Sequence, residues 1–188
     1  MNAVNFLAHP VSLVENWILA VGRGWEAHFS RYTYVARSVE DSRTHLRVPL
    51  EEVTPKWLIA QLNCLGPNEE LALHSTLTQG RRVQHIPMVD FASKSNAADS
   101  VLSWAKEHLN TELRLFDSGR AYHAYGLRPV SPRRWVRLMG LLLLANSPDQ
   151  APVIDSRWIG HRLLAGYSAL RWSRNTSQYV KLPAKISR

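Results

Sequence analysis

The sequence predicts a mixed α/β domain in which a largely antiparallel sheet is flanked by helices. Segments with helical apolar spacing alternate along the chain with runs in which every second residue is apolar. Two pairs of strand-like runs are separated by short turn sequences, "QGR" at 79–81 and "DSGR" at 117–120, which is typical of antiparallel hairpins. With 188 residues and 45% hydrophobic residues, the chain can bury one full core. We therefore expect a single domain over 1–188.

The first half of the chain is predicted to open with a helix and a strand and to close with a hairpin. Expected elements are a helix at 11–22, a strand at 28–38, a helix at 54–64, and paired strands at 70–78 and 81–91. Thr54 is a good N-cap for the second helix, and Pro55 suits its first position. The last strand ends close to an acidic residue, Asp90.

The second half is predicted to contain two further helices and several short strands. Expected elements are a helix at 95–109, two strands within 112–127 that turn at 117–120, a helix at 131–145, a strand at 151–158 and strand-like alternation over 161–183. Ser131 and Pro132 mark the start of the helix at 131–145. The strand at 151–158 ends near a second acidic residue, Asp155.

Positive charge is concentrated in the second half of the chain. Residues 1–113 hold ten Lys or Arg against twelve Asp or Glu, whereas residues 114–188 hold thirteen against three. Eleven of those thirteen are arginine, whose planar guanidinium suits phosphate. Nucleic acid or a nucleotide is the natural anionic partner, and a basic surface without a specific ligand is the equally simple alternative.

Individual arginines and aromatic residues indicate where an anionic partner would bind. Arg133, Arg134 and Arg137 lie in the first two turns of the helix at 131–145, where the helix dipole favours anions, so they suggest an external anion. Trp158, Tyr167, Trp172 and Tyr179 lie among the C-terminal arginines. Such aromatic residues either stack on bases or pack in a core.

Other features indicate a cytoplasmic protein with no membrane partner. The single cysteine, Cys64, excludes an internal disulfide framework and a multi-cysteine zinc site. The N-terminus has no basic start followed by a long apolar segment, so it predicts no secretory signal. The longest apolar run, 138–145, is far too short to cross a bilayer.

Three short motifs contain the residues most suited to chemistry. "MVDFA" ends an apolar run on Asp90, "SGRAYH" offers Ser118, Arg120 and His123, and "VID" ends on Asp155. A carboxylate at the end of a buried strand is unfavourable unless a metal, a basic partner or solvent meets it. Each residue also has a structural reading: the aspartates cap turns or pair with arginines, and the histidine packs within a sheet.

In this order and spacing the motifs resemble those of the archaeo-eukaryotic primase superfamily, the primase-polymerase fold. That family has an Asp-hydrophobic-Asp motif, a Ser-x-His motif, and a hydrophobic-Asp motif followed by a basic strand, here "HRLLAGYSALR" at 161–171. The likeness covers roughly 70–183. The resemblance implies an RRM-like sheet with flanking helices. It also implies a division of the chain into an N-terminal elaboration at 1–68 and a motif-bearing catalytic core at 69–183.

The resemblance also implies roles for particular residues. Asp90 and Asp155 would hold Mg²⁺ or Mn²⁺ and, with His123, form the catalytic group. Contacts to the (d)NTP would come from Ser118, Gly119, Arg120, His123, Arg162, Ser168 and Arg171. Independently of the resemblance, the basic second half of the chain leads us to expect contacts to nucleic acid from Arg133, Arg134, Arg137 and Arg174. Hard divalent cations bind carboxylate oxygens and neutralise triphosphate charge, which is why such a site needs converging acidic groups.

One position departs from the family pattern. The second Asp of the first motif would fall at position 92, where this chain has Ala92. Two functions therefore stay open: a primase-polymerase that extends single-stranded or primer-template nucleic acid from (d)NTPs, or a catalytically inactive nucleic-acid or nucleotide-binding module within a larger complex with a protein partner. An unrelated RRM-like sheet that binds RNA is less favoured, because no aromatic RNP signature is found.

Overall fold

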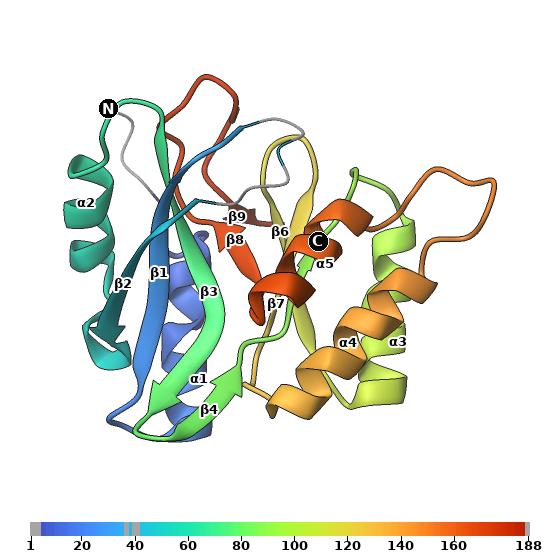
Figure 1. The fold of residues 1–188 in the computed structure, drawn as a ribbon, viewed down its shortest axis with the longest axis horizontal. Coiled ribbons are helices and arrows are strands. Elements are labelled where there is room, and N and C mark those ends of the chain that lie inside the picture. The colour runs from blue at the N-terminus through green and yellow to red at the C-terminus, as the bar shows by residue number, and fades with distance from the viewer. Residues whose placement is uncertain (1–4, 36–37, 39–41, 187–188) are drawn as a thin grey trace.

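The computed structural model describes residues 5–35, 38 and 42–186. This part of the chain folds into two antiparallel sheets with helices packed on them (Figure 1). The prediction of a mixed α/β fold with antiparallel sheets and flanking helices is confirmed. The strands are divided between two sheets, however, and the boundary between the sheets lies close to the acidic motifs.

The first sheet is built around a long central strand, β3. Its strands are β1 (Glu26–Thr33), β2 (Thr44–Pro49), β3 (Glu69–Gln79), β4 (Arg82–His85) and β8 (Ala169–Arg171). β1 pairs with one edge of β3, while β4 and β8 pair with successive parts of the other edge. β2 pairs with β1. The sequence did not indicate β2, because only Val48 of this strand is buried and the alternation is weak.

One face of the first sheet is covered by the N-terminal helices. These are the 3₁₀ helices η1 (Pro10–Leu13) and η2 (Leu50–Glu52), and the α-helices α1 (Val14–Val21) and α2 (Pro55–Asn63). Trp17 of α1 and Leu58 of α2 join Phe29, Leu73 and Trp172 of the sheet side in one buried cluster. The Thr54 hydroxyl accepts a hydrogen bond from the amide of Trp57, as expected for an N-cap.

The second sheet has the order β5, β7, β6, β9. Its strands are β5 (Met88–Asp90), β6 (Leu113–Asp117), β7 (Tyr122–Gly126) and β9 (Ala184–Lys185). Successive side chains of a strand point to opposite faces. Met88 and Tyr125 therefore join the core shared with the first sheet, whereas Val89 and Ala124 face a second core.

The second core lies between the second sheet and three helices. α3 (Ala97–Leu109), α4 (Pro132–Leu144) and α5 (Ser156–Ala165) pack there, with α4 against both of the others. The Ser131 hydroxyl accepts from the amide of Arg134, which confirms the expected start of α4. α4 buries Trp135 and Leu142, among others, at helical spacing.

Two sequence predictions about the acidic motifs are corrected by the structure. Residues 81–91 do not form one strand: β4 belongs to the first sheet and β5 to the second, and the chain crosses between them at Pro87. The expected strand at 151–158 is reduced to a single bridge between Ile154 and Phe91. Asp155 then caps α5, because its side chain accepts hydrogen bonds from the amides of residues 157 and 158.

The prediction of strand structure over 161–183 is also wrong for most of that segment. Residues 161–165 belong to α5, and only 169–171 of the tail form a strand, β8. α5 ends at Gly166, which adopts a left-handed conformation with φ of 78°. The predicted basic strand at 161–171 is therefore two elements: Arg162 lies on the helix α5 and Arg171 on the strand β8.

The division into 1–68 and 69–183 stays a prediction. β1 and β2 are part of the same sheet as β3, so the segment from Glu26 onward is hydrogen-bonded to the motif-bearing part. Among the described residues there is no helix with the length and apolar character needed to cross a membrane.

Candidate nucleotide pocket

Asp90 and His123 meet because their strands pair in register. β5 and β7 are antiparallel, with Asp90 opposite His123 and Met88 opposite Tyr125. All four side chains therefore point to the same face of the second sheet. The two apolar residues lie in the core, while the two polar residues lie at its open end, where His123 Nε2 is 3.6 Å from Asp90 Oδ1. That separation is longer than a hydrogen bond.

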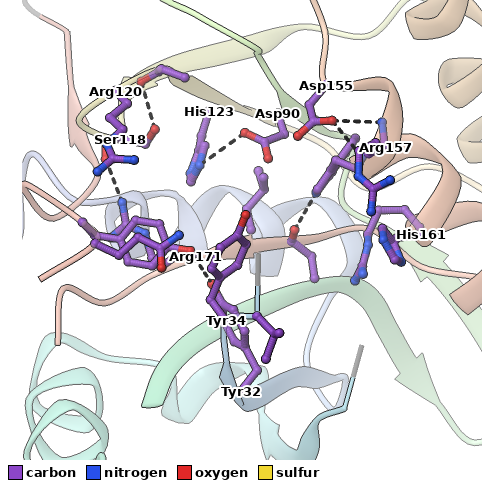
Figure 2. A pocket seen from close by; sticks show the side chains of 18 of the residues that line it. Tyr32, Tyr34, Asp90, Ser118, Arg120, His123, Asp155, Arg157, His161 and Arg171 are labelled. Carbon is purple, nitrogen blue, oxygen red and sulfur yellow. Dashed lines mark hydrogen bonds and ion pairs between the residues drawn. The ribbon is translucent and has the colours of Figure 1, made fainter. Parts of the chain in front are cut away.

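Asp155 joins this pair through the backbone. Its amide donates to the carbonyl oxygen of Asp90 over 3.1 Å, beside the bridge between Phe91 and Ile154. Its Oδ1 accepts from the amides of Arg157 and Trp158, at 2.9 and 3.1 Å. Two aspartates 65 positions apart in the sequence therefore lie side by side, with their side chains lining one pocket (Figure 2).

The turn between β6 and β7 is held by its own polar groups. The Ser118 hydroxyl and amide both donate to the carbonyl of Ala121, and the amide of Gly119 donates to Asp117 Oδ1. Gly119 has φ of 116°, and a Cβ there would lie 2.6 Å from Val180 Cγ2. Glycine is needed for the backbone conformation and for this close approach. The amide of Gly119 is thus occupied within the turn.

Arg171 connects this turn to the C-terminal segment. Its guanidinium donates to the carbonyl of Ser118 at 2.7 Å and also to the carbonyls of Ser173 and Lys181. The same group lies 4.0 Å above the ring of Tyr179. Arg171 is 5% exposed, so it is a nearly buried cation that both supports the pocket wall and contributes positive charge to it.

A buried carboxyl group, Glu70, organises the turn that follows β8. Glu70 is fully buried, and its oxygens accept hydrogen bonds from Ser173 Oγ, from the amides of Asn175 and Thr176, and from Thr176 Oγ1. The segment after this turn contributes Gln178, Tyr179 and Val180 to the pocket lining. Sequence reasoning missed Glu70; its only signal was a carboxyl group at the start of the apolar run "ELAL".

These elements enclose a cavity of about 460 Å³, a size that accommodates a nucleotide-sized ligand. Of the sequence-predicted residues, those that line it are Asp90, Ser118, Arg120, His123, Asp155, Arg162 and Arg171. All of these except Arg162 are labelled in Figure 2. Arginines 43 and 157 also line it. A pocket with several guanidinium groups around two carboxyl groups has a clear preference for an anionic ligand.

The N-terminal segment supplies a wall of the pocket that sequence reasoning did not assign. Tyr32 and Tyr34 line it from the end of β1, and Tyr34 is 46% exposed. Arg43 lies 4.4 Å above the ring of Tyr32 and donates to Ser30 Oγ. The alternation of aromatic and basic residues in "SRYTYVAR" was the available signal.

The pocket changes the protonation of its acidic and imidazole groups. Burial, together with the nearby charge of Asp155, raises the pKa of Asp90 from 3.8 to about 7, although Arg171 and Arg162 oppose this rise. Burial lowers the pKa of His123 to about 3, with a further contribution from Arg171. At neutral pH His123 is therefore uncharged, and Asp90 is close to its titration midpoint.

Other predicted residues do not line this pocket. Gly119 is packed in the turn, and Ser168 is fully buried, where its hydroxyl accepts from Trp135 Nε1. The three arginines of α4 are exposed and outside the lining, as is Arg174, which borders a separate hollow with Lys181. Their assignments to nucleotide and nucleic acid stay predictions.

The pocket lining includes two carboxyl groups, those of Asp90 and Asp155. Within the described residues, no group of three or more His, Cys, Asp or Glu is arranged to hold a metal ion. Ala92 is exposed and its amide donates to the carbonyl of Val153, so the third acidic position of the motif carries no ligand atom. Asp90 and Asp155 remain as two carboxyl groups facing one cavity.

The chain belongs to the AEP-like family, which is related to the archaeo-eukaryotic primases. A family model described as AEP-like, archaeo-eukaryotic primase 1D-like, matches residues 49–184, which is well over half of the chain. This match confirms the family resemblance inferred from the motifs. No curated protein matches the chain. Among solved structures, the catalytic domain of primase Repb' in complex with initiator DNA is similar, with a TM-score of 0.35 and 13% identity over 86% of this chain and 74% of that chain.

Proposed function

We propose that this domain is a primase-type nucleotidyltransferase that binds nucleic acid and a (d)NTP together with a divalent cation. The observation that supports this most directly is the convergence of Asp90, Asp155 and His123 in one cavity that several arginines also line. Asp90 and Asp155 come from motifs far apart in the sequence. They meet because the backbone of Asp90 pairs with that of His123 and accepts a hydrogen bond from the amide of Asp155.

The triphosphate would lie against the arginines of the pocket. Arg120, Arg162 and Arg171 line it together with Ser118, and guanidinium groups bind phosphate oxygens through paired hydrogen bonds. The exposed ring of Tyr34 offers a stacking surface for a base on the opposite wall. Nucleic acid would approach over the basic second half of the chain, with Arg133, Arg134, Arg137 and Arg174 as proposed phosphate contacts.

Asp90 and Asp155 would hold Mg²⁺ or Mn²⁺, with the remaining positions filled by phosphate oxygens and water. A bound divalent cation neutralises triphosphate charge and favours ionisation of the attacking hydroxyl. Burial raises the pKa of Asp90 most, and the charge of Asp155 raises it further; a cation between the two groups would offset both effects by favouring the ionised carboxylates. With only two protein carboxyl groups, we expect cation binding to be weak alone and stronger with nucleotide.

A second function, a nucleotide-binding or nucleic-acid-binding module without catalysis, is favoured by Ala92. Two-ion nucleotidyl transfer relies on carboxylates that bridge or flank both ions, and position 92 is an exposed alanine. Such a module would act within a larger complex with a protein partner. We expect either protein to work in the cytoplasm, where the exposed thiol of Cys64 stays reduced.

A nucleotide incorporation assay distinguishes these functions when it is combined with a binding measurement. The full chain is incubated with primer-template, labelled dNTPs or NTPs and Mn²⁺, and nucleotide affinity is measured by calorimetry. Asp90→Asn and Asp155→Asn remove the proposed ligands. Asp149→Asn is the control, because Asp149 is exposed, lies outside the pocket and has φ of 61°, which asparagine tolerates.

Incorporation that is lost in both pocket variants and kept in the control supports the enzyme. Mn²⁺-dependent nucleotide binding without incorporation, lost in the same variants, supports the binding module. Absence of nucleotide binding in the unmodified chain, or equal affinity in all variants, overturns the enzyme and the nucleotide-binding module. The nucleic-acid-binding module is overturned if the unmodified chain also fails to bind the primer-template.

A further inference from the structure

The face of the first sheet that turns away from α1 and α2 is polar and basic. Phe29 of β1 packs with both helices in the first core, so the residues on either side of it along β1 point to the other face. In Figure 1, α1 lies behind β1 and β3, and this other face is turned towards the viewer. The register places His28 opposite Arg47 of β2, and Ser30 opposite His45. Paired residues of neighbouring strands share a face.

Contacts between strands show that these side chains form one surface. His74 of β3 lies with its Nε2 2.8 Å from Ser30 Oγ, and its ring centre is 5.1 Å from that of His45. Tyr167, in the turn between α5 and β8, stacks on His74 at 4.2 Å. Three strands and this turn therefore contribute to a continuous surface. The open face is defined here as His28, Arg43, His45, Arg47 and Tyr167.

The open face runs into the nucleotide pocket. The guanidinium of Arg43 donates to Ser30 Oγ at 3.0 Å and lies 4.4 Å above the ring of Tyr32. Arg43 and Tyr32 both line the pocket. The chain then continues into β2, where His45 and Arg47 follow at every second position, roughly 7 Å apart along the strand. These side chains extend the arginine lining of the pocket across the sheet.

The exposed charge on this face has one sign. Arg47 is exposed, and Arg43 is half-buried. Three acidic residues lie on the strands of the first sheet. Glu70 is fully buried and occupied by the C-terminal turn, Glu69 accepts from the amide of Gly66, and Glu26 starts β1 at the end away from the pocket. The ten basic against twelve acidic residues of 1–113 therefore conceal a local basic surface.

We infer that the open face binds a single-stranded segment of the nucleic acid that enters the pocket. This rests on the proposed function, because it assumes that the pocket acts on a nucleic-acid strand. Arg43 and Arg47 would contact backbone phosphates. The exposed ring of His45 and the half-exposed ring of Tyr167 would stack on bases. A duplex keeps its bases paired inside, so it would leave these rings unused.

The test measures binding of a labelled poly-dT oligonucleotide, and of a duplex of equal length, to the full chain by fluorescence anisotropy. Arg47→Glu and His45→Ala change exposed residues of the open face. Arg23→Glu is the matched control, because Arg23 is exposed and follows α1, which covers the opposite face. Arg133→Glu tests the alternative position of the strand on α4. Nucleotide affinity of the unmodified chain is measured in parallel by calorimetry.

We expect the single strand to bind more tightly than the duplex. Arg47→Glu should weaken single-strand binding by about tenfold and reduce the slope of log affinity against log salt by about 0.7 or more, because a phosphate contact is lost. His45→Ala should weaken binding by about fivefold through lost stacking. Arg23→Glu should leave the affinity unchanged.

Equal losses in Arg47→Glu and Arg23→Glu, a loss confined to Arg133→Glu, or tighter binding of the duplex overturns the inference and leaves the nucleotide pocket as proposed. The inference also fails if Arg47→Glu abolishes binding of a polyglutamate peptide while oligonucleotide binding persists, since the open face would then bind an acidic protein. Oligonucleotide binding that depends on Arg47 and His45, without any nucleotide binding, supports the open face and overturns the proposed enzyme.

Discussion

Replacing Asp90 with asparagine should stabilise the folded domain above neutral pH. The pKa of Asp90 is raised from 3.8 to about 7 by burial and by Asp155. Between these values the folded state keeps a proton that the unfolded state releases, so this contribution to stability is present at low pH and is lost as pH rises through about 7. Asparagine cannot ionise, so the variant avoids that loss.

The magnitude follows from the pKa difference. A rise from 3.8 to about 7 corresponds to roughly 4 kcal/mol in the free energy of unfolding at about pH 8. The Asp90 side chain is 26% exposed, so hydration and screening reduce the expected gain to about 2 kcal/mol. By about pH 5.5 the gain should fall to roughly half of its value at alkaline pH, because folded Asp90 is then already protonated.

Urea denaturation followed by tryptophan fluorescence measures this effect, since the chain has seven tryptophans. The unmodified chain, Asp90→Asn and the control Asp149→Asn are compared at both pH values. Asp155→Asn removes the charge that raises the pKa, so the gain from Asp90→Asn should shrink in that background. A variant that is destabilised at both pH values, or a gain that does not shrink as pH falls, would refute this reasoning.

Three further changes test other parts of the structure. Ala92→Asp, at an exposed position beside Asp90, should raise Mn²⁺ affinity by about tenfold in a calorimetric titration because it adds an oxygen ligand; unchanged affinity would show that position 92 does not face the ion. Glu70→Gln should lower the free energy of unfolding by about 2 kcal/mol, because an amide cannot accept all four hydrogen bonds; Glu69→Gln, whose carboxyl group accepts from the amide of Gly66, is the adjacent control, and an equal loss there would contradict the special role of Glu70. Burial lowers the pKa of His74 from 6.5 to about 2, so the folded domain loses stability as pH falls below 6.5, because only the unfolded chain takes up a proton there. His74→Gln should therefore reduce the loss in the free energy of unfolding between pH 7 and pH 5 by about 2 kcal/mol. An unchanged acid-unfolding midpoint would argue against this assignment.

Local rules in the sequence predicted much of the secondary structure. Thr54 and Ser131 marked helix starts because a side-chain oxygen next to the first turn accepts an otherwise unpaired amide. The hairpin around Asp117 was predicted because its turn residues and the alternation of its strands act over short distances. The family was also accessible, since Asp90, His123 and Asp155 keep their motif types and order.

The sequence misassigned the surroundings of Asp155. An apolar run followed by a carboxyl group reads equally as a strand end or as a helix N-cap, and residues 161–171 alternate enough to resemble a strand. The choice depended on tertiary contacts: only Ile154 finds a strand partner, and the amides of 157 and 158 find the side chain of Asp155. Propensity is a weak prior where such contacts compete.

The sequence by itself determined the starts of α2 and α4, the hairpins, the acidic motifs and the uneven charge, because each depends on residues close together in the chain or on composition alone. Only the tertiary structure decided that Asp90 and Asp155 share a backbone hydrogen bond, that Tyr34 and Arg43 form the opposite wall, and that Glu70 holds the C-terminal turn. These are pairings between distant segments. Their geometry depends on strand register and on the packing of two sheets, and neither is encoded in any single stretch of residues.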